Sequence, residues 1–167
     1  DEEAEIGRYL KELSAKHEGL LTIIAPRHPT RGVEIRDILQ DKYQLKTALR
    51  SANEKIQPET EVYIADTIGE MGIWYELCPI VFIGGSLIPH GGQNFMEPSR
   101  CRDAVIVGPH MHNFTDAMNR AKRADGIIQV DETVDLIDMV DQLLSNKELL
   151  DAKRSLAYNW ATSEAKV

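Results

Sequence analysis

Short runs of almost exclusively apolar residues recur along the chain, and they restrict its fold more than any other feature. They lie at residues 20–25, 62–65, 80–83, 104–107 and 127–130, and polar or glycine-containing loops follow them. Runs of this length without apolar and polar alternation are typical of strands that are buried on both faces of a parallel sheet. The sequence therefore predicts a core of parallel strands.

Helical periodicity separates these runs. Residues 43–48 fit a strand by their alternation or a helix by the spacing of Leu45 and Leu49, and we favour the strand. Strands that alternate with helices predict an α/β fold, with a parallel sheet covered by helices and right-handed crossovers. At 167 residues the chain has the size of one domain. We expect helices over residues 2–17, 69–77, 95–102, 115–124, 133–145 and 147–165, and a weaker helix over residues 32–40.

The charge of the chain argues against non-specific binding to nucleic acid or to an anionic membrane. Its 19 Lys and Arg residues against 27 Asp and Glu residues give a formal net charge of −8. No apolar run approaches the roughly 18 residues that a spanning helix needs, and the acidic start does not resemble a secretory signal. Cys78 and Cys101 lack C-x-x-C spacing, so we expect buried, reduced thiols.

The loops that follow the apolar runs are the candidate binding site. Ligands of open parallel sheets bind beyond the carboxyl ends of the strands. The loops at residues 26–29, 66–70, 84–94 and 108–110 are rich in glycine and polar side chains. Because the carboxyl ends of parallel strands meet at one edge of a sheet, we expect these loops to converge.

The loop at residues 84–94 is the most informative of these. Gly91 and Gly92 remove side chains where a backbone can approach a ligand, and Asn94 is a suitable N-cap for a helix that begins near Phe95. Backbone N–H groups and the positive end of that helix would form an anion site. The alternative is that the glycines only permit turns. We favour the anion site because two glycine pairs precede the capped helix.

Side chains beside these loops have a binding role and a structural alternative. Glu97 can accept hydrogen bonds from two sugar hydroxyls, or it can complement the helix dipole. Arg27 can contact a phosphate through its forked guanidinium, or it can form a surface ion pair. In the loop at residues 66–70, Ile68 and the Gly69 backbone can hold a base or ribose. The alternative is that Asp66, Thr67 and Glu70 cap the next helix.

Other classes of site are disfavoured. His90, His110 and His112 lack the Cys or carboxylate neighbours of a zinc site, so we expect no metal. The sequence has no G-x-x-x-x-G-K-[ST] loop, no G-x-G-x-x-G after the first strand and no G-x-S-x-G elbow. A phosphate site without a nucleophile remains.

Longer motifs carry a resemblance to a known family. Residues 66–75 read DTIGEMGIWY, residues 81–98 read VFIGGSLIPHGGQNFMEP and residues 107–114 read VGPHMHNF. Together with APRHP at residues 25–29 and the pair Arg50 and Ser51, they resemble the C-terminal half of the 3-deoxy-D-manno-octulosonic acid (Kdo) transferases of lipopolysaccharide synthesis. The resemblance covers nearly the whole chain.

This resemblance implies a Rossmann-like domain, the C-terminal half of a GT-B glycosyltransferase, which binds the donor CMP-Kdo. It places residues 1–167 in that domain, with the first strand and the N-terminal acceptor domain outside them. It implies no metal and no other cofactor. The CMP contacts that it implies are Pro26, Arg27, Ile68, Gly69, Glu70, Asn94, Phe95, Met96 and Glu97.

The resemblance also implies the reaction of the complete enzyme. That reaction is an inverting transfer of Kdo to the lipid A precursor at the cytoplasmic face of the inner membrane, with a general base from the N-terminal domain. We therefore expect this chain to be soluble and to bind the donor without turnover, while the other domain contacts the membrane. The family usually has His where Gln93 stands, which suggests altered phosphate binding because Gln carries no charge. A UDP-sugar enzyme of the same fold and a non-catalytic nucleotide-binding module are the alternatives.

Overall fold

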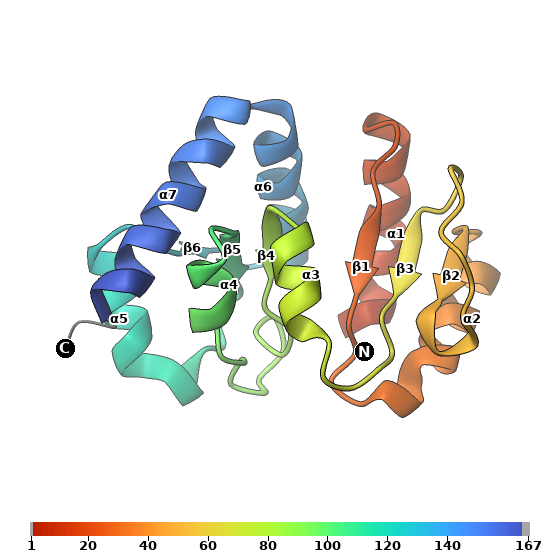
Figure 1. Ribbon diagram of the computed structural model, residues 1–167, viewed down its shortest axis with the longest axis horizontal. Coiled ribbons are helices and arrows are strands. Elements are labelled where there is room, and N and C mark those ends of the chain that lie inside the picture. The colour runs from red at the N-terminus through yellow and green to blue at the C-terminus, as the bar shows by residue number, and fades with distance from the viewer. Residues whose placement is uncertain (1, 165–167) are drawn as a thin grey trace. The chain divides into compact units, whose positions relative to one another are not determined.

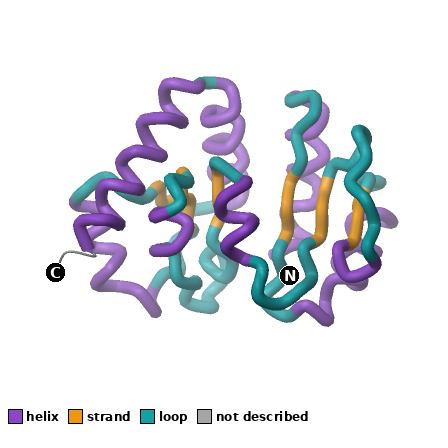
Figure 2. The backbone as a smooth tube through the Cα atoms, viewed as in Figure 1, coloured by secondary structure: helices purple, strands orange, loops and turns teal. Residues whose placement is uncertain are grey.

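The computed structural model of the protein describes residues 2–164, with side chains described from Glu5 onward. Its helices and strands belong to two compact units, a first unit at Asp1–Met71 and a second unit at Gly72–Val167 (Figure 1). Both units combine helices with short strands (Figure 2). None of the helices described is both long enough and apolar enough to cross a membrane.

The first unit is built on a parallel sheet with the strand order β1-β3-β2. Helix α2 packs on this sheet and on α1, because the apolar side chains of both helices join those of the strands in one buried cluster. Single 3-10 turns follow two of the strands, at Pro29–Arg31 and Arg50–Ala52. The elements are α1 (Glu2–Lys16), β1 (Thr22–Ile24), α2 (Gly32–Tyr43), β2 (Thr47–Leu49) and β3 (Val62–Ile64).

Residues 43–48 divide between helix and strand, so the predicted strand was placed too early. Helix α2 continues to Tyr43 and ends at Gln44, whose left-handed backbone (φ 53°) directs its N–H to the carbonyls of Gln40 and Leu39. Leu45 then turns into the core, and the strand begins at Thr47. The spacing of Leu45 and Leu49 is therefore not helical, because both residues lie beyond the left-handed end of α2 and Leu49 belongs to β2.

The second unit contains a parallel sheet with the strand order β4-β5-β6 and helices on both of its faces. Val105 and Val107 of β5 pack with residues of α5 and α7, while Ala104 and Ile106 pack on the opposite face with residues of α6. The elements are α3 (Met71–Leu77), β4 (Ile80–Phe82), α4 (Met96–Arg100), β5 (Ala104–Val107), a 3-10 turn (His112–Phe114), α5 (Thr115–Arg123), β6 (Ile128–Gln129), α6 (Thr133–Ser145) and α7 (Lys147–Glu164).

The predicted α/β class with parallel strands and flanking helices is confirmed. The strands had been expected in one sheet, whereas their ladder hydrogen bonds form two sheets of three strands each. The alternation of strand and helix predicts parallel pairing, but it does not say which strands are neighbours. That information lies in the packing of side chains between elements.

Candidate functional site

The carboxyl ends of the strands in the first unit are in register. Ile24 of β1 and Leu49 of β2 both lie opposite Ile64 of the central strand β3. Pro26 and Asp66 therefore lie at the same level, two residues beyond that register. The predicted convergence of strand-end loops holds within this unit.

Arg50, which follows β2, holds the loop that follows β3. Its Nε donates to Oε1 of Glu70 and its Nη2 to Oε2, both at 2.6 Å, while Nη1 donates to the Tyr63 hydroxyl at 3.2 Å. The Thr67 hydroxyl also donates to Glu70 Oε1. The hydrogen bonds from Arg50 and from Thr67 lower the pKa of Glu70 to about 2, so this carboxyl group is ionised at neutral pH.

Asp66 makes a second connection between the ends of β2 and β3. Its carboxylate accepts the Ser51 backbone N–H at 2.9 Å and the Ser51 hydroxyl at 2.6 Å. Only 6% of Asp66 is exposed, and Gly32 at the start of α2 lies so close that any side chain there would overlap the carboxylate. The predicted capping of α3 by Asp66, Thr67 and Glu70 is therefore wrong, because these side chains are occupied elsewhere and α3 begins only at Met71.

Arg27 differs from Arg50 in that it is not bound to another described residue. It is exposed just beyond β1, and it forms no hydrogen bond or ion pair with any residue from 2 to 164. The preceding Pro26 is buried, which anchors the backbone at this point. The predicted alternative of a surface ion pair for Arg27 is not observed in the described residues, so its guanidinium is available to a ligand.

In the second unit, the loop after β4 is fastened to the end of β5 through Ser86. The fully buried Ser86 hydroxyl donates to the Ile83 carbonyl at 2.5 Å and accepts the Gly108 N–H at 2.9 Å. The Ser86 carbonyl in turn accepts the His110 N–H at 2.8 Å. We refer to the contacts of Ser86 with Gly108 and His110 as the Ser86 clasp.

Gly91 and Gly92 both have left-handed backbones, with φ of 86° and 79°. The space that their side chains would fill is taken by Asn113 and by Met111, respectively. The Gly92 N–H donates to the Gly85 carbonyl at 3.0 Å. Turn geometry and close packing therefore account for both glycines without a ligand, and their role beside a phosphate stays a prediction.

The segment from Asn94 to Glu97 begins α4 one residue later than predicted. Asn94 Oδ1 accepts the Met96 N–H at 2.8 Å, so its side chain still satisfies a helix-end donor, although Phe95 occupies the N-cap position. The Phe95 ring is buried and stacks on Trp160 with the ring centroids 5.4 Å apart. Only the backbone of Phe95 can reach a ligand, whereas Asn94 and Glu97 are exposed.

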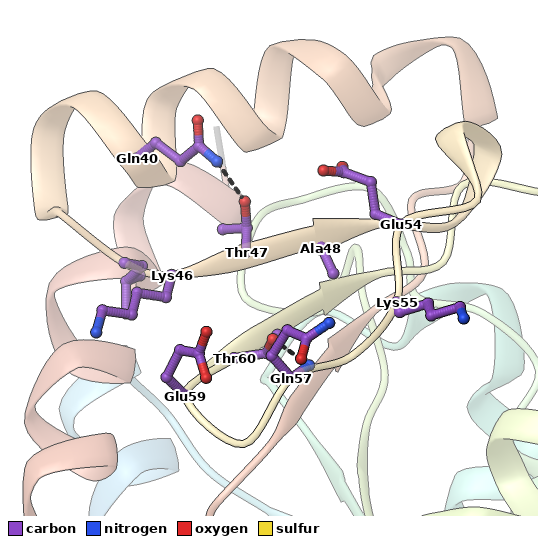
Figure 3. A pocket seen from close by; sticks show the side chains of 10 residues that line it. Gln40, Lys46, Thr47, Ala48, Glu54, Lys55, Gln57, Glu59 and Thr60 are labelled. Atoms are coloured by element: carbon purple, nitrogen blue, oxygen red, sulfur yellow. Dashed lines mark hydrogen bonds between the residues drawn. The ribbon is translucent and has the colours of Figure 1, made fainter.

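A pocket, the possible metal ligands and the two cysteines of the described residues were also compared with the predictions. A pocket lies beside the edge strand β2, around Gln40, Thr47, Glu54 and Thr60, and none of the predicted CMP contacts lines it (Figure 3). No group of three or more His, Cys, Asp and Glu side chains in the described part of the chain is arranged to hold a metal. Cys78 and Cys101 are partly buried, and burial raises the pKa of both thiols, as expected for unreactive cysteines.

Comparison with known proteins identifies the family. No family model matches the chain. The 3-deoxy-D-manno-octulosonic acid transferase of Haemophilus influenzae is 36% identical over 139 residues, and a probable mitochondrial one of Arabidopsis thaliana is 39% identical over 143 residues. Both matches cover 83% of this chain and 32% of the relative, so the chain spans about a third of the length of these relatives.

A solved structure matches over a larger share of both chains. It is the C-terminal CMP-Kdo binding domain of WaaA from Acinetobacter baumannii, with a TM-score of 0.89 and 30% sequence identity. The match covers 95% of this chain and 82% of that one. The chain therefore belongs to the 3-deoxy-D-manno-octulosonic acid transferase family, in which it corresponds to the C-terminal domain.

Proposed function

We propose that residues 1–167 are the donor-binding domain of a Kdo transferase and that they bind CMP-Kdo. The observation that carries this proposal is the likeness to a domain that binds CMP-Kdo, which extends over 95% of this chain with a TM-score of 0.89. A shared fold alone would leave the ligand open. The 30% identity over the same match supports a shared ligand as well as a shared fold.

Arg27 is the group that we assign to the phosphate of CMP. Arg27 is exposed and has no hydrogen-bond or ion-pair partner among the described residues, so its guanidinium can bind a ligand. A forked, charge-assisted contact between arginine and phosphate is one of the stronger hydrogen-bonded interactions in proteins. Pro26 contributes by fixing the backbone from which Arg27 extends.

The nucleoside contacts are assigned to the loops at residues 68–70 and 94–97. Exposed Asn94 and Glu97 side chains can bind the ribose hydroxyls or the base, and buried Phe95 and partly buried Met96 contribute through the backbone. In the other loop, Ile68 offers apolar surface with 86% of the residue exposed. Gly69 and Glu70 contribute backbone groups beside it.

In the complete enzyme this domain would hold the leaving group during an inverting transfer of Kdo to the lipid A precursor. A general base on the acceptor domain removes the proton of the acceptor hydroxyl, while Arg27 stabilises the charge on the departing CMP phosphate. The net charge of −8 on this chain disfavours contact with anionic lipid, so membrane docking at the cytoplasmic face of the inner membrane falls to the acceptor domain.

Calorimetric titration of the chain tests the donor assignment. We expect CMP to bind at least about tenfold more tightly than UMP or UDP, because the exocyclic amine and N3 of cytosine present a different hydrogen-bonding edge from that of uracil. Equal affinities for the three nucleotides would exclude a CMP-specific site. Preference for UDP would instead favour a UDP-sugar enzyme of the same fold.

Arg27→Ala is expected to raise the Kd for CMP by about tenfold to a hundredfold, since a charged hydrogen-bonded contact contributes about 1.5–3 kcal/mol. Arg36→Ala is the control, because it removes an arginine of the same unit that is not a predicted CMP contact. Arg36 lies on α2 and contacts its neighbour Asp37 at 3.3 Å. Glu97→Ala should also weaken binding, by about tenfold. Equal Kd values for the Arg27 and Arg36 variants would remove Arg27 from the site.

A further inference from the structure

Arg50 and Glu70 form a complete two-pronged ion pair within the first unit. Two nitrogens of one guanidinium face two oxygens of one carboxylate at 2.6 Å each, which is the arrangement that gives an arginine pair its directional strength. The third nitrogen of Arg50 is bonded to the Tyr63 hydroxyl, whose residue is only 5% exposed. Arg50 is therefore anchored on the central strand β3 and committed to Glu70.

The Glu70 side chain is equally committed to the protein. Its Oε1 accepts from Arg50 and from the Thr67 hydroxyl, and its Oε2 accepts from Arg50. A ribose that used this carboxylate as its acceptor would have to compete with the charged pair. The Glu70 side chain is thus placed to hold the loop rather than to meet a ligand.

The same contacts leave the tip of the loop facing outward. Ile68 has 86% of its surface exposed, and Gly69 adopts a left-handed backbone (φ 82°) with no atom within 4 Å of the position of a Cβ. Thr67 and Glu70 lie on either side of this tip. Their side chains bind each other, and Glu70 also binds Arg50. The loop therefore presents apolar surface and bare backbone at one point.

A second connection reinforces the first from the adjacent residues. Ser51 follows Arg50 directly, and its N–H and hydroxyl both bind the carboxylate of Asp66. Consecutive residues after β2 thus hold both the start and the end of the segment from Asp66 to Glu70. A loop restrained at both ends loses less conformational freedom when a ligand binds to its tip.

We propose that Arg50 is a positioning residue for the donor nucleotide: through the Glu70 side chain it fixes the loop whose Ile68 side chain and Gly69 and Glu70 backbone contact CMP. This inference rests on the proposed function, which assigns those residues to the donor. It separates the two strand-end arginines by role. Arg27 contacts the phosphate, and Arg50 shapes the surface that receives the nucleoside.

A double-mutant cycle on CMP affinity tests the proposal. Arg50→Gln and Glu70→Gln are each expected to raise the Kd about tenfold, and the double variant is expected to match the singles because both disrupt one contact. Losses that multiply to about a hundredfold would show that each side chain meets the ligand independently, and would overturn the proposal. Arg36→Gln, which makes the same charge change at a partly buried arginine of α2, is the control.

Arg50→Lys distinguishes positioning from simple attraction between charges. Lysine keeps the positive charge but lacks the fork, so we expect it to lose nearly as much CMP affinity as Arg50→Gln. Wild-type affinity in the lysine variant would overturn the proposal. If Arg50→Gln does not fold, the cycle is run with Arg50→Lys, and urea unfolding of every variant shows which are folded.

The outcomes also separate this proposal from the function on which it rests. A wild-type chain without CMP preference would refute the donor assignment itself. A wild-type chain that prefers CMP, with unchanged affinity in Arg50→Gln and Arg50→Lys, would refute only the role of Arg50. A lower urea midpoint with unchanged Kd would reduce the ion pair to a contribution to stability and would likewise overturn the proposal.

Discussion

Gly108→Ala is expected to lower the free energy of unfolding by about 3 kcal/mol, at the upper end of the range for overpacking a close contact. A Cβ at this position would lie 2.6 Å from the carbonyl carbon of Ser86 and 2.8 Å from the nitrogen of Leu87. Both atoms belong to the backbone, which the Ser86 clasp holds in place, so no side-chain rotation can relieve the overlap. Urea unfolding of the variant at constant m-value measures the loss.

Gly72→Ala provides the matched control for that measurement. Gly72 lies in α3, and its Cβ would meet only the far end of the Glu97 side chain, at 3.4 Å. Alanine favours a helix over glycine by roughly 0.5–1 kcal/mol, so this variant should be unchanged or slightly more stable. If the two variants lose the same stability, the Ser86 clasp does not restrain the loop.

The boundaries of the elements could be predicted where apolar periodicity and flanking loops agree. The strand at residues 104–107 and the helix at residues 133–145 have the predicted bounds. The prediction failed around Gln44, where a left-handed residue separates α2 from β2 without a glycine to announce it. The division of the strands into two sheets could not be predicted, because it depends on contacts between distant elements.

The position of side chains at the strand ends of the first unit could be predicted, but their hydrogen-bond partners could not. The strand ends correctly located Arg27, Asp66 and Glu70, since a parallel sheet brings its carboxyl ends to one edge. Local sequence suggested that Asp66 and Glu70 cap a helix, whereas they bind Ser51 and Arg50, which precede them by 15 and 20 residues. Local sequence patterns do not reveal a contact between residues so far apart. The one available indication was that Arg50 directly follows a strand, and the predicted strand at residues 43–48 ended too early to show this.

Phe95 shows the same limitation in the second unit. The family resemblance places it among the ligand contacts, but the residue is 1% exposed and its ring packs against those of Trp160 and Phe114. A motif records that a residue matters without saying whether the side chain or the backbone is responsible. The burial of the ring assigns the side chain to the core and leaves only the backbone for the ligand.

Asp103 carries a buried carboxyl group directly before β5, at the end opposite to the carboxyl end of that strand. It is 1% exposed, and its Oδ2 has no hydrogen-bond partner among the described residues. Burial raises the pKa of Asp103 to about 7, although Arg154 of α7 opposes the shift. The Asp103 charge in turn contributes to the raised pKa values of its neighbours Tyr75, Cys78 and Cys101.

Asp103 should make the protein less stable as the pH rises from about 4 to about 7. The unfolded chain loses the Asp103 proton near pH 3.9, whereas the native state keeps it until about pH 7, so unfolding is increasingly favoured between these values. The raised pKa corresponds to a penalty on the order of 2–4 kcal/mol at pH 8. Asp103→Asn removes this titration, so its urea midpoint should exceed that of the wild type at pH 8 and approach it at pH 4.5.

The difference between variant and wild type isolates Asp103, because the other titrating groups contribute to both profiles. Asp151→Asn on α7 removes the same charge from an exposed position and should give a profile parallel to that of the wild type. A parallel profile for Asp103→Asn as well would mean that water or structural relaxation solvates the Asp103 carboxylate in the native state. A difference that grows with pH up to about pH 7 and then levels off would establish that the fold retains this proton.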